Sequence, residues 1–106
     1  MQSIKAFGEY LSGKGLRETT IRTYEKAVDR FREWLVTENL LATEVNYPDL
    51  LAWIQALRET NLHAKTINVK LGAIRHYYAY LIETNQAKNN PAQGLVLKGV
   101  DRKSVV

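Results

Sequence analysis

The stretch that decides the fold runs from Ala64 to Gln86 and reads AKTINVKLGAIRHYYAYLIETNQ. Apolar side chains recur along it at intervals of three and four residues, which places them on one face of an α-helix. The stretch therefore predicts one long amphipathic helix over residues 64–86, with its apolar face turned into a core. The positions on that face are Ile67, Leu71, Ile74, Tyr78 and Leu81.

The first two turns of this predicted helix are polar and basic. They carry Lys65, Thr66, Asn68 and Lys70, and no acidic residue follows before Glu83. Acidic side chains stabilise the first turn of a helix and basic ones the last, because of the helix dipole. Bases at this end are unfavourable for the helix itself, which indicates a negatively charged partner at its N-terminus.

Three further helical patterns precede this stretch. Apolar residues recur at helical spacing over residues 3–13, 20–38 and 46–60. Gly15 suits the tight turn that follows the first pattern, and Asn46 suits the capping position before the third. The sequence therefore predicts an all-α bundle, and we expect these residues in its core: Phe7, Leu11, Tyr24, Val28, Phe31, Leu35, Ile54, Leu57, Ile67, Leu71, Ile74, Tyr78 and Leu81.

The helical periodicity stops after Gln86. The pair Asn90-Pro91 disfavours a helix, and a weak extended pattern follows at residues 95–97. We therefore expect one domain over residues 1–92 and the beginning of a linker over residues 93–106.

Composition and charge limit the class of protein. The chain has 106 residues and no cysteine, so thiolate metal sites and a cysteine nucleophile are excluded. It contains no run of about 18 apolar residues and no pattern of a signal peptide. The net charge is −1 over residues 1–59 and +5 over residues 60–106. This asymmetry indicates a polyanionic partner, although basic residues also serve solubility alone.

A row of three bases in the second predicted helix has two interpretations. Arg22, Lys26 and Arg30 stand four residues apart, so they share one side of the helix. An acid lies three residues after each of them, which is typical of a salt-bridged solvent face. The other interpretation is a stripe that binds an anion, with its contacts concentrated between Arg17 and Lys26.

The sequence shows no constellation of catalytic or metal-ligating residues. His63 falls in a predicted loop and His76 on the predicted solvent side of the last helix, without clustered carboxylates nearby. Tyr78 is expected in the core, whereas Tyr77 and Tyr80 occupy flanking positions suited to packing or to partner contacts. We expect no metal and no cofactor.

Six short motifs resemble the core-binding domain at the start of tyrosine recombinases (phage-type integrases), and they occur in the order typical of that domain. The resemblance extends from about residue 4 to residue 98, and each motif alone is a few residues of helix-start and packing signal. Arg17 departs from the pattern, because the family commonly has a small capping residue such as Ser there. The motifs are GLRETTIRTY at 15–24, FREWL at 31–35, TIN at 66–68, LGAIR at 71–75, YY at 77–78 and NNPA at 89–92.

The resemblance implies a four-helix orthogonal bundle, called SAM-like, that grips duplex DNA from one side. In the full enzymes a C-terminal catalytic domain grips the other side and supplies the active-site residues and the tyrosine nucleophile. This chain ends where that domain would begin, and none of its tyrosines matches the nucleophile. The implied partners are double-stranded DNA and other recombinase subunits, with no membrane and no small-molecule substrate. The implied setting is cytoplasmic, in a bacterium or borne by a phage.

The resemblance also implies that the second and fourth helices face the major groove with their first turns. Asn68 suits a bidentate pair with adenine, but a structural hydrogen bond to the neighbouring loop explains it equally well. Arg75 has two possible partners, DNA or an acid inside the bundle. The candidate DNA-binding residues are Lys14, Arg17, Thr20, Arg22, Thr23, Lys26, His63, Lys65, Thr66, Asn68 and Lys70.

An alternative function is a helical protein-protein interaction module. Small helical bundles bind other proteins through exposed aromatic patches, and Trp34, Trp53 and Tyr77 are candidates for such a patch. Burial of the tryptophans under neighbouring loops is the competing interpretation. A free-standing enzyme is the third class, and the sequence offers no candidate residues for it.

Overall fold

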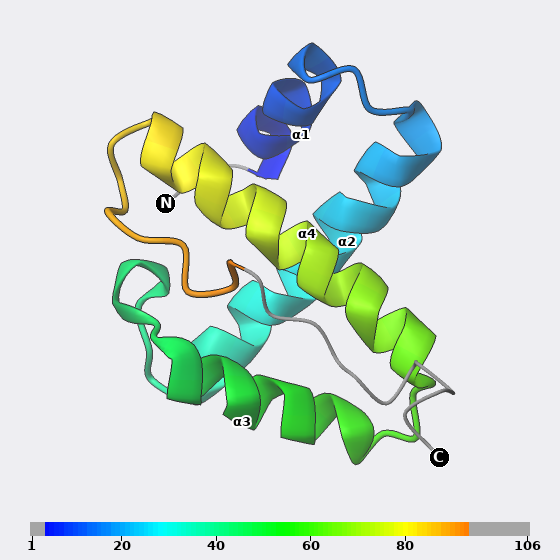
Figure 1. Ribbon diagram of the computed structural model, residues 1–106, viewed down its shortest axis with the longest axis vertical. Coiled ribbons are helices and arrows are strands. Elements are labelled where there is room, and N and C mark those ends of the chain that lie inside the picture. Colours follow the sequence, from blue (N-terminus) through cyan, green and yellow to red (C-terminus); the bar gives the residue numbers. More distant parts are fainter. Residues whose placement is uncertain (1–3, 94–106) are drawn as a thin grey trace.

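The computed structural model describes residues 4–93, which form four α-helices and a short 3₁₀ turn without any strand (Figure 1). The predicted all-α fold is confirmed. The expected extended piece at residues 95–97 and almost all of the expected linker lie outside the described residues. The elements are α1 (Ile4–Gly13), α2 (Glu18–Thr37), η1 (Ala42–Glu44), α3 (Tyr47–Arg58) and α4 (Ala64–Glu83).

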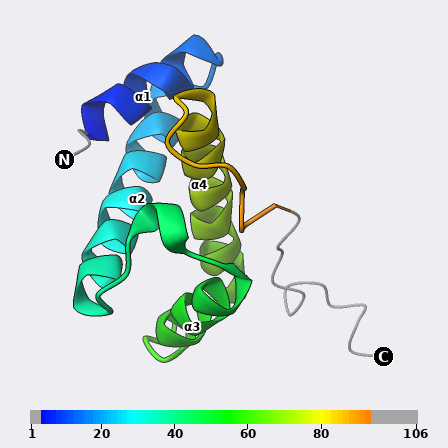
Figure 2. The same cartoon turned by 90° about the vertical axis from the view of Figure 1, so that its left-hand side faces the viewer.

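The steep crossing of α2 and α4 forms the centre of the fold. These two helices share the largest interface in the molecule, and Figure 1 shows them crossing near their middles. α1 lies across the end where α2 begins and α4 ends, and α3 lies at the opposite end (Figure 2). Although α2 and α4 begin at opposite ends, their N-terminal halves diverge from the crossing on the same side of the molecule, the right-hand side of Figure 1.

Aromatic side chains join the four helices in the core. The Phe31 ring of α2 lies 5.0 Å from the Trp53 ring of α3 and 6.4 Å from the Tyr78 ring of α4, measured between centroids. At the other end, the Phe7 ring of α1 lies 5.5 Å from the Tyr77 ring. Edge-on aromatic pairs of this kind add stability beyond the apolar area that they bury.

Most of the predicted core is confirmed, with two corrections. Tyr24 and Leu57 are only half-buried. Trp53 and Tyr77 are each 3% exposed, and Tyr80 is also buried. Trp53 and Tyr77, two of the three residues predicted for an exposed aromatic patch, therefore pack within the bundle and cannot form that patch.

The start of α2 differs from the prediction by two residues. The helix begins at Glu18 rather than Thr20, and Arg17 takes the capping position with an extended backbone and no side-chain cap hydrogen bond. The carboxylate of Glu18 suits the positive end of the helix dipole, which stabilises this earlier start. α3 begins as the sequence predicts, because Asn46 and Asp49 exchange side-chain and backbone hydrogen bonds of 3.1 Å.

The segment after α4 folds back along that helix. α4 ends at Glu83, three residues before the predicted end, and Asn85 takes a left-handed conformation with φ of 62°. Further along, the Asn90 side-chain amide donates to the carbonyl of Arg75 at 3.1 Å, and its oxygen accepts from the amide of Ala92. These bonds hold Ala92 in a fully buried position.

Phe31→Ala should destabilise the fold by about 3–5 kcal/mol, because it removes the ring that connects three helices and leaves a cavity. The matched control is Val36→Ala on the same helix, where the side chain is 75% exposed and the change should stay within about 0.5 kcal/mol. Urea unfolding followed by circular dichroism measures both. Equal losses in the two variants would contradict this description of the core.

Candidate nucleic-acid interface

A basic groove lies between the N-terminal halves of α2 and α4, on the side where the two helices diverge. Its volume is about 220 Å³. Because one wall comes from each helix, residues more than forty positions apart in the sequence face the same space. The lining residues are Arg22, Thr23, Lys26, Ala27, Thr66, Val69 and Lys70.

Positive charge is concentrated at this groove. Burial, and then the charges of Arg30 and Lys26, lower the pKa of Lys70 from its ordinary value of 10.5. Lys26 and Lys70 line the groove itself, and Arg30 lines a neighbouring hollow together with Lys70. Lys26 and Arg30 form no ion pair with any residue in the range 4–93.

The salt-bridged interpretation of the basic row is therefore wrong for two of its three members. Arg22 does form an ion pair, but with Glu18 at 2.9 Å, four residues before it, and not with the acid three residues after it. Both side chains of that pair are largely exposed, and such a pair contributes little to stability.

A second, shallower hollow of about 360 Å³ adjoins the groove. Threonines dominate it, and the hydroxyl of Thr23 donates to the backbone carbonyl of Thr19 at 3.0 Å. Thr23 and Val69 line both spaces, so the two hollows form one continuous surface, the α2–α4 surface. The residues of the second hollow are Thr19, Thr20, Thr23, Tyr24 and Val69.

The start of α4 carries no acidic residue in its first turn. His63 caps the helix, because its Nδ1 atom accepts a hydrogen bond of 3.0 Å from the backbone amide of Lys65. His63 and Lys65 are both exposed. The imidazole thus satisfies one orphan N–H group, and the ammonium of Lys65 remains at the positive end of the helix dipole.

The structure brings most, but not all, of the predicted site residues together. Thr20, Arg22, Thr23, Lys26, Thr66 and Lys70 lie on the α2–α4 surface, and Arg17, His63 and Lys65 lie at the first turns of its two helices. Asn68 is half-buried, interacts within the protein and lines neither hollow.

Lys14 lines neither of the two hollows. Its ammonium forms an ion pair of 3.7 Å with Glu83 and lies 5.2 Å from the centroid of the Tyr10 ring. Glu83 is the last residue of α4, which ends on the side of the molecule where α2 begins (Figure 2). The role of Lys14 as a DNA contact stays a prediction.

Sequence reasoning missed Val69 as a member of this region. It named Arg30 as part of the basic row of α2 but not among the candidate DNA-binding residues. Val69 is an apolar residue in the polar first turns of α4, one turn after Thr66. This exception to the local pattern could have indicated that Val69 belongs to the site.

His76 and Arg75 occupy the edge of the α2–α4 interface. The predicted solvent position of His76 is wrong, because its ring is half-buried and lies 5.2 Å from the ring centroid of Tyr24. Burial, and then the nearby charge of Arg75, lower the pKa of His76. Arg75 is half-buried and interacts within the protein, and its predicted acidic partner stays a prediction.

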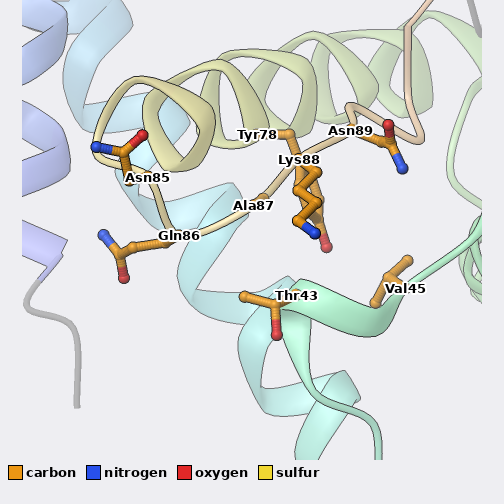
Figure 3. Close-up of a pocket in the computed structure, with 8 residues that line it drawn as sticks. All are labelled: Thr43, Val45, Tyr78, Asn85, Gln86, Ala87, Lys88 and Asn89. Carbon is orange, nitrogen blue, oxygen red and sulfur yellow. The ribbon is translucent and has the colours of Figure 1, made fainter.

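A separate pocket of about 330 Å³ lies between η1 and the segment after α4 (Figure 3). Lys88 is its only cationic side chain. The Tyr78 hydroxyl donates to the carbonyl of Ala42 at 2.6 Å, and burial raises the pKa of Tyr78 well above its usual value. A buried, protonated and hydrogen-bonded phenol is a poor nucleophile, so this pocket offers no evident chemistry.

Two further properties of the described range bear on function. Every helix within residues 4–93 is too short or too polar to cross a lipid bilayer. Across the same residues, no three His, Asp or Glu side chains gather closely enough to hold a metal ion.

The fold and the sequence place this chain in a known family. Residues 4–85 match the family described as "Phage integrase, N-terminal SAM-like domain", and the chain belongs to that family. This confirms both the predicted class of fold and the resemblance to tyrosine recombinases. No solved structure gives a significant match to the chain.

Curated relatives carry names from the same class of enzyme. The chain is 32% identical over 98 residues to "Tyrosine recombinase XerD" of Rickettsia prowazekii, and 92% of it is aligned. It is 31% identical over 103 residues to "Tyrosine recombinase XerC" of Herpetosiphon aurantiacus, with 95% of it aligned. These alignments cover 32% and 34% of the two relatives, so the chain spans about a third of their length.

Lys70→Met should stabilise the fold by up to about 0.5 kcal/mol, because it removes a partly buried charge next to two others. Since the pKa of Lys70 is lowered in the folded state, the unfolded state binds more protons at alkaline pH. The stability advantage of Lys70→Met over the unaltered protein should therefore shrink as the pH rises from the lowered pKa to 10.5, and this comparison cancels the opposite contribution of Tyr77 and Tyr78, whose pKa values burial raises. Thermal unfolding across this range measures both effects. A loss of stability in the variant would contradict the conclusion that the Lys70 charge is repelled by Arg30 and Lys26.

Proposed function

We propose that this domain binds duplex DNA through the α2–α4 surface, as the non-catalytic DNA-binding part of a tyrosine recombinase. The observation that carries the proposal is the gathering of Arg22, Lys26 and Lys70 in one groove, with Arg30 in the neighbouring hollow and Lys65 in the first turn of α4. Cations grouped in this way neutralise phosphates and release counterions, which drives the binding of proteins to DNA.

The shape of the surface supports the same proposal. Two helices present their first turns on one side of the molecule, and the major groove, about 12 Å wide, admits an α-helix. The hydroxyls of Thr20 and Thr66 and the backbone N–H groups at the helix starts supply hydrogen bonds that fix a protein on the phosphate backbone. The relatives named tyrosine recombinases are about three times as long, which fits a binding domain joined to a separate catalytic one.

The chemistry of DNA strand exchange is assigned in this proposal to that other domain. Three of the six tyrosines, Tyr77, Tyr78 and Tyr80, are buried in the core. The domain supplies affinity and orientation, and other recombinase subunits bind adjacent DNA in the same way. It needs no cofactor for this role.

Binding to a fluorescent duplex should weaken steeply with salt. Each phosphate that the domain contacts adds about −0.9 to the slope of log affinity against log salt concentration, so four or five contacts predict a slope of about −4. Between 50 and 200 mM salt, the affinity should fall on the order of 10²-fold. Fluorescence anisotropy measures the slope, and a salt-independent signal would contradict the proposal.

Charge reversal identifies the surface that binds. Lys65→Glu combined with Lys70→Glu should abolish binding, because phosphates are repelled at the start of α4. The matched control is Lys14→Glu combined with Lys88→Glu, which changes the net charge equally at exposed positions away from the groove. It should keep most of the affinity. Equal losses in the two double variants would show that only net charge matters, and circular dichroism verifies that both remain folded.

A further inference from the structure

One apolar side chain lies in the middle of the basic α2–α4 surface. Val69 is 44% exposed and lines both the groove and the adjoining threonine hollow. Its neighbours on the same side of α4 are the polar Thr66, one turn before it, and the cationic Lys70. A single exposed apolar residue is ordinary on a protein surface, so the exposure alone carries no meaning. What matters is that Val69 shares the groove with Arg22 and Lys26 of α2 and with Lys70 of α4.

One polar side chain that lines the same spaces as Val69 has its donor already occupied. The hydroxyl of Thr23 already donates its hydrogen to the carbonyl of Thr19 at 3.0 Å. Thr23 therefore offers a ligand its methyl group and acceptor lone pairs, but no donor. Ala27, which also lines the groove, adds only a methyl group. The centre of the surface is thus apolar, and the cations stand around it.

A duplex has one apolar feature that fits such a centre. In the major groove, the four base pairs show hydrogen-bond donors, acceptors and a single hydrocarbon group, the C5-methyl of thymine. Cytosine carries a hydrogen at the same position, unless it is methylated. If Lys26, Arg30 and Lys70 hold the phosphates, a base edge comes to lie over the apolar centre between them.

We propose that Val69, together with the methyl groups of Thr23 and Thr66, is a contact for the 5-methyl group of a pyrimidine in the major groove. The inference rests on the proposed DNA binding and makes it more specific. Val69 is then a specificity-determining residue, and the domain prefers thymine over uracil and 5-methylcytosine over cytosine at the contacted position. Burying one methyl group against an apolar side chain corresponds to a preference of about fourfold in affinity.

Two pairs of duplexes test the preference without knowledge of the natural target. The first pair is an alternating A·T duplex and the same duplex with deoxyuridine in place of thymidine, which removes only the methyl groups. The second pair is an alternating G·C duplex with and without 5-methylcytosine, which adds them. Anisotropy titrations at one fixed salt concentration should give about fourfold tighter binding to the methylated member of each pair.

Val69→Ala separates the protein contact from any effect of methylation on the duplex itself. The substitution shortens the side chain at an exposed helical position, and alanine favours the helix, so the fold is retained. Both affinity ratios should fall to near one in this variant. Val36→Ala, which shortens an exposed valine near the far end of α2, should keep both ratios.

The outcomes distinguish this inference from the proposed function. Salt-dependent binding without discrimination between the members of each pair would overturn the role of Val69 and leave DNA binding intact. Discrimination that survives in Val69→Ala would overturn it as well, because the duplex and not the valine would then cause the preference. Absence of binding to all four duplexes would overturn the proposed function and this inference together.

Discussion

The crossing of α2 over α4 is the constraint on which the rest of this structure depends. Two amphipathic helices bury their apolar faces against each other, with Phe31 from α2 and Ile74 from α4 fully enclosed. Small residues are buried on both helices, Ala27 on α2 and Gly72 on α4, and a Cβ atom at Gly72 would lie 3.4 Å from the Tyr24 hydroxyl of α2. Because the helices cross steeply, their first turns diverge on one side. The polar residues of both starts then face a common space, although nothing in the local sequence connects them.

The charge on this surface runs against the stability of the domain. Lys26, Arg30 and Lys70 repel one another, and the partial burial of Lys70 makes its charge more costly. Glu33 lines a neighbouring hollow together with Arg30 and Lys70, but within residues 4–93 it forms no ion pair with either of them. The hydrophobic core offsets the cost, and the retained repulsion fits a surface whose missing negative charges come from a partner.

The sequence predicted the class of fold because periodicity reports which face of each helix is apolar. The sequence predicted less well how much of the surface of each helix is buried by its neighbours. α4 packs against α1, α2 and α3, so Tyr77 and Tyr80 are buried although they flank the apolar stripe. The start of α2 moved to Glu18 because helix-dipole stabilisation outweighed the absence of a capping side chain at Arg17. The groove itself joins residues distant in the chain, which the periodicity of a single helix cannot report.

Chemical-shift mapping tests whether DNA binds to the α2–α4 surface. Amide spectra of the isotopically labelled domain, recorded as a short duplex is added, report which residues sense the ligand. The largest changes should fall in the first halves of α2 and α4, within residues 18–30 and 64–72. Changes centred instead on α3, or on the pocket between η1 and the segment after α4, would contradict it.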